Sequence, residues 1–212
     1  MPSNPSTSEL VALGAPMALR DGSRVRLRQI RSSDKDLLRS GFQRLSKDAR
    51  YRRFLVPTPR LTAPTVRYLT EVNHHDHEAI VALDEDTGEG VGVARFVRSG
   101  ERPDLAEGAV TVVDEWQRRG LGTLLLEVLG VRAREEGITS FTALVLANND
   151  RAIELLESLG PVRIVDREAG TVEIEMAIPE IALSPVLRKL LRVAAHTNSA
   201  DPQVARAGPR PA

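Results

Sequence analysis

The chain has 212 residues, its 29 basic and 29 acidic side chains balance to a formal net charge of zero, and it contains no cysteine. A neutral molecule has no overall field that attracts nucleic acid or an anionic membrane, and a chain without cysteine has neither disulfides nor a thiol nucleophile. No segment reaches the apolar length of a membrane span, and the first residues do not resemble a secretion signal. We therefore expect a cytoplasmic protein with no nucleic-acid or membrane partner, which is a monomer or a homodimer.

The composition of the two ends separates them from the body of the chain. Residues 1–17 are rich in serine, proline and small residues, which predicts a flexible N-terminal arm, and residues 198–212 predict a disordered tail for the same reason. In residues 180–197, leucines recur at helical spacing between basic residues. We expect a C-terminal helix docked on the domain there, with a helix that binds a partner or a membrane surface as the alternative. Residues 18–179 remain as one domain.

Strand-like and helix-like segments alternate along this domain. The first strand is predicted at 24–30, where basic and apolar residues alternate as they do in an edge strand. The elements that follow are helices at 34–45 and 64–72, a hairpin at 78–97, a strand at 106–113, a helix at 120–137, a buried strand at 140–147, a helix at 149–160 and a hairpin at 162–178. This order predicts an α/β (α+β) fold with a mixed central sheet flanked by helices.

The segment QRRGLG joins the strand at 106–113 to the helix that follows it. The first N–H groups of a helix lack intrahelical partners and lie at the positive end of the helix dipole, so such an end binds phosphate. Gly120 and Gly122 have no Cβ, which permits unusual backbone angles and close approach of a ligand. Arg118 and Arg119 add charge and forked donors that suit phosphate oxygens. The context favours a pyrophosphate site over a solvated pair of arginines.

Two better-known phosphate motifs do not fit this segment. A P-loop requires Gly-Lys-Ser/Thr at its end, and a dinucleotide fingerprint requires glycine where Leu125 stands. The remaining pattern, Gln-x-x-Gly-x-Gly after the strand VTVV, resembles motif A of the GNAT superfamily of N-acetyltransferases. The helix NDRAIELLESLG resembles the Asn-x-x-Ala-x-x-Leu-Tyr-x-x-x-Gly-Phe helix of the same family. The order of elements agrees with that family over roughly residues 20 to 178.

The resemblance implies acetyl-CoA as cosubstrate and no metal. In the GNAT fold the fourth and fifth strands, here 106–113 and 140–147, splay apart and hold the pantetheine arm between them. By resemblance, backbone groups of the first of these strands pair with the arm, the glycine turn holds the pyrophosphate, and Asn149 lies near the pantetheine. The cofactor-binding residues expected on this basis are Val112, Val113, Gln117, Arg118, Arg119, Gly120, Leu121, Gly122, Thr123 and Asn149.

A narrower resemblance concerns the acceptor. The phrases LSKDARYRRF, HHDHEAIVAL, VGVARFVR and AEGAVTVVDEWQRRGLGTLL resemble the acetyltransferase domain of bacterial Pat-type protein lysine acetyltransferases. This implies direct transfer of an acetyl group from acetyl-CoA to an amine, with a protein lysine as the first choice. A small-molecule amine is the alternative acceptor, and a noncatalytic acyl-CoA-binding sensor module is the alternative from another functional class.

Glu107 is the predicted general base. A lysine amine, with an ordinary pKa of about 10.4, is protonated near neutrality and must lose a proton before it can attack. By resemblance, Glu107 matches the glutamate base of Pat-type enzymes. Asp104, Asp114 and Glu115 are weaker candidates, and the last two are expected to cap and orient the turn. The family's tyrosine acid is replaced by Leu156, which leaves the general acid unassigned, with water as the first choice.

Two further clusters have simpler interpretations. The segment HHDHE at 74–78 contains possible metal ligands, but two of its histidines are adjacent and no second cluster exists, so no metal site is predicted. We expect this loop to line the acceptor site, with His77 near the substrate. The basic segment ARYRRF at 49–54 is predicted as helix and core with solvated arginines, because nucleic-acid binding requires a larger basic face.

Overall fold

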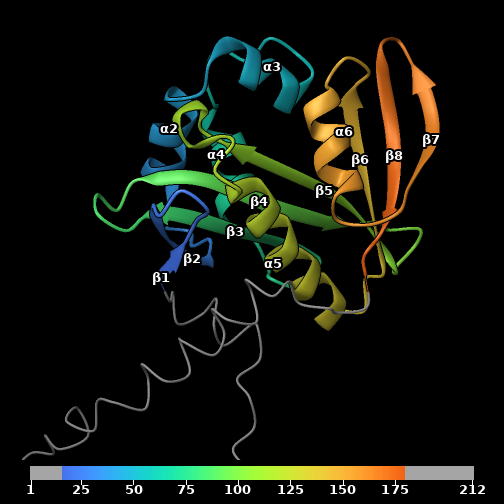
Figure 1. Ribbon diagram of the computed structural model, residues 1–212, viewed down its shortest axis with the longest axis horizontal. Helices are drawn as coiled ribbons and strands as arrows, with labels where there is room; N and C mark the ends of the chain where they lie inside the picture. The colour runs from blue at the N-terminus through green and yellow to red at the C-terminus, as the bar shows by residue number, and fades with distance from the viewer. Residues whose placement is uncertain (1–15, 180–212) are drawn as a thin grey trace, which may run out of the picture.

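The computed structural model of the protein describes residues 16–179, which form one mixed sheet with helices on both faces (Figure 1). The strands are β1 Pro16–Ala18, β2 Arg24–Gln29, β3 His77–Asp84, β4 Gly90–Arg98, β5 Leu105–Val112, β6 Ser140–Leu146, β7 Val162–Glu168 and β8 Thr171–Ala177. The helices are α2 Lys35–Gln43, α3 Lys47–Phe54, α4 Ala63–Thr70, α5 Leu121–Glu135 and α6 Asp150–Glu157, with a 3-10 turn η1 at Asp114–Trp116.

The eight strands have the order β1-β2-β3-β4-β5-β6-β8-β7, and the β5–β6 pair alone is parallel. This pair is short: it holds only from Leu105↔Ser140 to Glu107↔Thr142. Beyond Glu107, β5 continues along β4 as far as Val112 without a partner on its other edge. The two strands that were expected to splay, at 106–113 and 140–147, are therefore β5 and β6, and the predicted fold class is confirmed.

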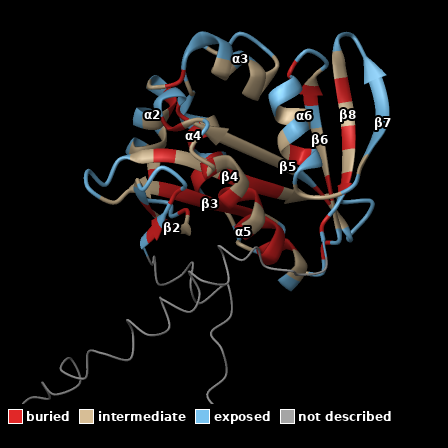
Figure 2. Ribbon diagram, in the orientation of Figure 1, coloured by how far each residue is buried: buried red, intermediate tan, exposed pale blue. Residues whose placement is uncertain are grey.

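Helix α5 covers one face of the sheet, lying across β3, β4 and β5 (Figure 1). Its leucines and valines are nearly all buried, and Figure 2 shows the buried residues concentrated on α5 and the central strands. Gly92 in β4 makes this close contact possible, since a Cβ there would come within 2.9 Å of Leu125 Cδ1. Helix α5 is thus fixed against the sheet along its length, which fixes the turn at its N-terminus as well.

Helices α2 and α4 pack on the opposite face. A small apolar cluster of Ile30, Ala79 and Val81 lies beneath them, with Val72 and Val93 packed against it. Helix α3 lies between these helices and α6, above the end of β5 (Figure 1). The sheet therefore separates two layers, one that presents the N-terminus of α5 and one that presents α2, α3 and α4.

Several details differ from the sequence-based expectation. Strand β1 begins at Pro16, inside the range expected as a flexible arm, and Met17 is buried. Because β1 pairs with β2, the strand expected at an edge is covered. Strand β6 is only partly buried, with Leu144 50% exposed, because the splay removes its neighbour. The predicted helix at 180–197 and tail at 198–212 lie outside the described residues.

The basic segment at 49–54 was predicted as helix, and it forms most of α3. This helix begins after Ser46, whose side chain accepts a hydrogen bond from Ala49 N, and ends at Leu55 in a left-handed conformation. Its apolar residues are too few for a clear periodic pattern, so the cap is the better signal. Among residues 16–179, no helix is both long and apolar enough to cross a membrane.

Candidate active site

The turn that enters α5 has the geometry of an anion-binding helix terminus. Gly120 precedes the helix with φ of 86°, a left-handed conformation that strongly favours glycine. The first intrahelical hydrogen bond of the helix joins Leu124 N to Gly120 O at 3.1 Å. The amides of the three residues before it, Leu121, Gly122 and Thr123, thus lack intrahelical partners and point out of the helix end. The seven expected residues from Gln117 to Thr123 all lie in this turn or in the first residues of α5.

The two arginines of the turn have different environments. Arg119 lies over the Trp116 ring at 4.9 Å, donates to Glu115 O at 2.8 Å and approaches Asp21 at 3.3 Å. The Arg119 guanidinium is therefore held against the protein. Arg118 is exposed, has φ of 63°, and makes no hydrogen bond or ion pair with the described part of the chain. Its guanidinium is the one available to a ligand at this turn.

Only some of the backbone groups at the end of β5 are free to bind a ligand. Val113 N donates to Val91 O at 3.0 Å, so this amide is engaged by the neighbouring strand. Gln117 Nε2 donates to Val112 O at 3.1 Å, which fixes the approach to the turn. Backbone groups of an antiparallel strand point alternately to its two edges, and the register then directs Val110 and Val112 to the edge that β6 leaves open. A ligand strand along β5 would meet Val110 and Val112 rather than Val113.

Helix α6 forms the other side of the opening. Asn149 occupies its N-cap position as expected, but its side chain makes no capping bond. Its Oδ1 instead accepts a hydrogen bond from Arg52 Nη1 of α3 at 3.1 Å, which bridges the gap between the two helices. Leu156, in the slot of the family's tyrosine, is buried in the main core. Leu155 approaches the turn, lying 3.4 Å from where a Cβ of Gly122 would be.

The acidic pair after β5 ties α3 to the turn. Asp114 accepts hydrogen bonds from Ser46 N and Oγ at 2.8 and 2.9 Å, and Glu115 pairs with Arg44 at 3.0 Å. Ser46 is itself the N-cap of α3. The two side chains were expected to cap and orient the turn, and they instead connect it to the start of α3 and to Arg44. They also place α3 over the splayed strands.

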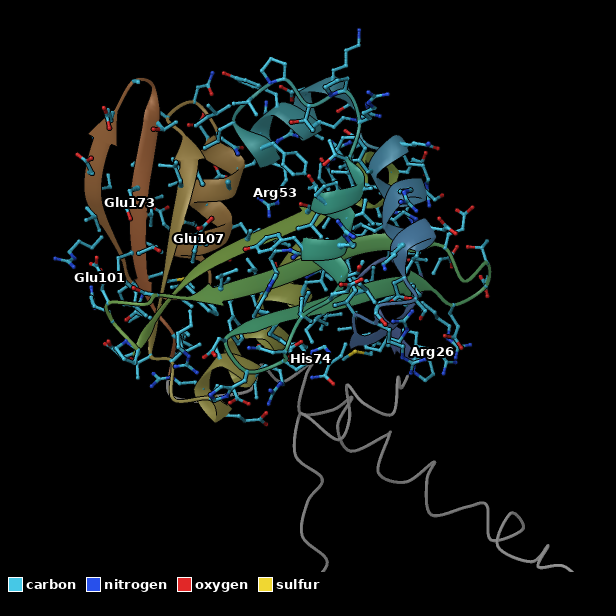
Figure 3. The ribbon with its side chains drawn as sticks, turned by 180° about the vertical axis from the view of Figure 1, so that it is seen from behind. Arg26, Arg53, His74, Glu101, Glu107 and Glu173 are labelled. Carbon is cyan, nitrogen blue, oxygen red and sulfur yellow. The ribbon has the colours of Figure 1, made fainter. Side chains whose placement is uncertain are left out.

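Glu107 is the last residue of β5 that is paired with β6, so it lies where the two strands separate. It is exposed, and its side chain is on the face of the sheet covered by α2, α3 and α4, since it pairs with Val97 in β4. Arg53 of α3 is the arginine whose charge interacts with Glu107. Figure 3 shows these two side chains in the same opening below α3, with His74 far from them.

Near Glu107 the same face carries Arg95, which the sequence did not single out, and His77, which was expected near the substrate. Arg95 Nη1 lies 3.0 Å from His77 Nε2, and the His77 ring packs on Tyr68 with centroids 4.9 Å apart. Burial, followed by the charge of Arg95, lowers the pKa of His77 to about 4. His77 is therefore neutral near pH 7. Through its pairing with Val97, His77 lies on the same face of the sheet as Glu107.

The other histidines of the HHDHE segment have structural partners. His74 Nδ1 lies 2.7 Å from Glu78 Oε1, and Glu78 is fully buried. Arg132 of α5 contacts the same carboxylate at 3.3 Å, and His75 pairs with Glu136. Within residues 16–179, no group of three or more potential ligands is arranged to hold a metal ion.

A cavity of about 70 Å³ lies between α2, α4 and the sheet. Apolar side chains such as Phe42, Phe54 and Leu69 form most of its wall, and Arg53 and Arg95 contribute the basic groups. The sequence suggested solvated arginines for α3, but Arg52 and Arg53 are half-buried and turned to the site.

Comparisons with known proteins identify the family and the fold. The model of the acetyltransferase (GNAT) family matches residues 42–160. Acetyltransferase Pat of Mycolicibacterium smegmatis is 32% identical over 176 residues, which are 83% of this chain and 52% of the relative, so the chain spans about half of that protein.

Solved structures share the fold. The GNAT domain of S. lividans PAT has 33% identity and a TM-score of 0.72, over 77% of this chain and 96% of that one. The structure of yncA from Salmonella typhimurium with its cofactor acetyl-CoA has 21% identity and a TM-score of 0.58, over 74% of this chain and 96% of that one, which shows a common fold. The motif-based prediction is confirmed: this chain belongs to the acetyltransferase (GNAT) family.

Proposed function

We propose that the protein is an acetyl-CoA-dependent N-acetyltransferase that transfers the acetyl group directly to an amine, with a protein lysine as the acceptor. The observation that carries this proposal is the early end of the β5–β6 pair at Glu107, which opens an unpaired strand edge leading to the α5 turn. A narrow polar chain can pair with that edge, and a diphosphate can occupy the helix end.

The residues fit coenzyme A. The amides of Leu121, Gly122 and Thr123 have no intrahelical partner. A Cβ at Gly122 would lie 3.4 Å from the Leu155 side chain and would occupy space next to these amides. Arg118 would add a free guanidinium for the diphosphate. Val110 and Val112 would pair with the pantetheine arm through their backbone groups, and Asn149 closes the far side. Bound here, acetyl-CoA supplies an activated acetyl thioester at the splay.

Glu107 would act as the general base. It lies at the splay, where a thioester carbon would be presented, and on the face from which an acceptor can enter. A carboxylate there accepts the proton that the attacking amine loses. Asp104 and Asp114 are poorer candidates, because Asp104 pairs with Arg102 at 3.7 Å and Asp114 caps α3. The Glu107 carboxylate has no ion pair within the described residues.

The thiolate that leaves must either be protonated or be stable enough to leave as an anion. Leu156 is buried in the core and offers no acid. A simple thiol has a pKa of about 8.5, so its thiolate is an acceptable leaving group, and water in the exposed cleft can protonate it. The proposed mechanism therefore uses one protein base and no protein acid.

The test measures thiol release from acetyl-CoA with a panel of lysine peptides and small amines, for the native protein and Glu107→Gln. Removal of a general base is expected to lower kcat by roughly 100- to 10,000-fold. Acetyl-CoA binding, followed by calorimetry, is expected to stay within about threefold, because Glu107 lies outside the diphosphate turn. An unchanged kcat in Glu107→Gln would remove Glu107 from the mechanism.

A noncatalytic acyl-CoA sensor is the second candidate, and the buried leucine at the acid position is the observation that favours it. The same two measurements separate the candidates. Tight binding of acetyl-CoA without turnover of any amine supports the sensor. If only small amines are acetylated, the acceptor is a small molecule and not a protein lysine.

A further inference from the structure

Arg95 is a buried cation without a counterion. It is 5% exposed, and its guanidinium contacts His77 Nε2 at 3.0 Å and Leu69 O at 3.1 Å. Neither partner carries a negative charge, because His77 is neutral in this environment. Among the described residues, no carboxylate lies within ion-pair distance of Arg95. A buried guanidinium normally pairs with an anion, since an uncompensated charge destabilises the fold.

Arg53 brings a second guanidinium to the same cavity. Its ring contact is with Phe54, at 5.3 Å from the centroid, and it has no hydrogen bond or ion pair within residues 16–179. Burial lowers the pKa of Arg53, and burial together with the charge of Arg53 lowers the pKa of Arg95 to about 10. The two cations therefore repel each other across the cavity, and an anion between them would relieve both effects.

The position of this pair relative to Glu107 is set by the β4–β5 register. Arg95 is opposite Ala109, two residues after Glu107 on the same face of β5. Diagonal neighbours of this kind are roughly 7–8 Å apart. An amine held at Glu107 would thus have the two guanidiniums within the span of one small molecule or of two adjacent residues of a peptide. Most of the remaining wall of the cavity is apolar, and its other polar residues are Thr111 and Asp34, whose carboxylate is paired with Arg28 at 2.7 Å.

We propose that Arg53 and Arg95 bind a carboxylate of the acceptor, so that the enzyme selects amines that carry a carboxylate close to the reacting nitrogen. The forked donors of arginine suit a carboxylate in two-point contact. This inference rests on the proposed acetyltransferase function and specifies its acceptor. The carboxylate comes either from an acidic residue beside a protein lysine or from a free amino acid, and the experiment distinguishes these sources.

The experiment compares matched acceptors that differ only in one charge. One arm uses lysine peptides with glutamate or glutamine directly before or after the lysine. The other arm uses β-alanine and γ-aminobutyrate against their primary amides. The expected result is a kcat/KM at least about tenfold higher for the carboxylate member of a pair, because a site built to pair a charged group rejects the neutral analogue. The arm that shows the preference identifies the source.

Arg53→Gln is the deciding variant, because Arg53 is at the end of a surface helix and its replacement leaves the buried Arg95 in place. We expect the preference in kcat/KM for the carboxylate to fall to less than about threefold. Any change in kcat/KM for the amides should be by the same factor for every amide. Arg53→Lys should restore part of the preference. Arg60→Gln, an equal loss of charge at an exposed position outside the cavity, should leave the preference intact.

Two outcomes would overturn the inference. One is equal kcat/KM for the acids and amides in both arms, and the other is a preference that Arg53→Gln does not alter. If no acceptor is turned over, the proposed function fails, and calorimetry of the same acceptor pairs on the CoA-bound protein decides the inference independently. Tighter binding of the acids that depends on Arg53 supports it, and equal binding refutes it.

Discussion

The conformation of Gly120 permits a sharp test of the phosphate turn. Gly120 has φ of 86°, and a Cβ there would touch the Arg20 side chain at an ordinary distance of 3.5 Å. The cost of Gly120→Ala therefore comes from the left-handed backbone, about 1–2 kcal/mol of unfolding free energy. For a chain of this length, each kcal/mol lowers Tm by roughly 2–4 °C, so the expected decrease is roughly 2–8 °C.

Gly170→Ala is the matched control. Gly170 has φ of 83° in the β7–β8 turn, and nothing lies within 4 Å of its Cβ position. Its backbone cost should equal that of Gly120→Ala, but Gly170 is remote from the α5 helix end. We expect both variants to lose similar stability in thermal unfolding, while only Gly120→Ala loses affinity for acetyl-CoA.

The difference arises because the chain relieves strain at Gly120 by rotating the peptide groups that follow. Those groups carry the amides of Leu121 and Gly122, which are proposed to bind the diphosphate. We expect calorimetry to show at least about tenfold weaker acetyl-CoA binding for Gly120→Ala, equal to roughly 1.4 kcal/mol, and unchanged binding for Gly170→Ala. Equal affinity of the two variants would refute the assignment of the diphosphate to this turn.

Three further predictions concern charged side chains. Arg118→Gln should weaken acetyl-CoA binding in calorimetry with little change in Tm, whereas Arg119→Gln, which loses the Trp116 contact, should mainly lower Tm; the reverse pattern would exchange their roles. Arg132→Leu leaves the buried Glu78 carboxylate with less compensation and should cost about 3–5 kcal/mol in denaturant unfolding; a loss below about 1 kcal/mol would contradict this. The pKa of His77 is about 4 in the folded protein, against 6.5 for a solvent-exposed histidine, so the unfolded state binds more protons between these two pH values. Stability should therefore fall as pH decreases from 6.5 towards 4, and His77→Gln should flatten this part of a Tm–pH curve.

Much of the fold could be predicted from the sequence, because its signals are local. The hairpin at 78–97 and the leucine-rich helix after QRRGLG have periodicities that belong to single elements, and the structure contains both. Gly120 adopts the left-handed backbone that its turn required. The short helix α3 was predicted over 49–54, but its arginines were expected in solvent, because eight residues with three arginines give little apolar periodicity to show which side faces the protein.

The sequence by itself determined the family and the position of the turn, since strand, glycines and helix are adjacent along the chain. Only the tertiary structure decided which groups reach the opening. It engages Val113 N with Val91, holds Arg119 on Trp116, and turns the α3 arginines inward. These outcomes depend on strand register and on helix packing between segments far apart in sequence, and no local pattern encodes either of them.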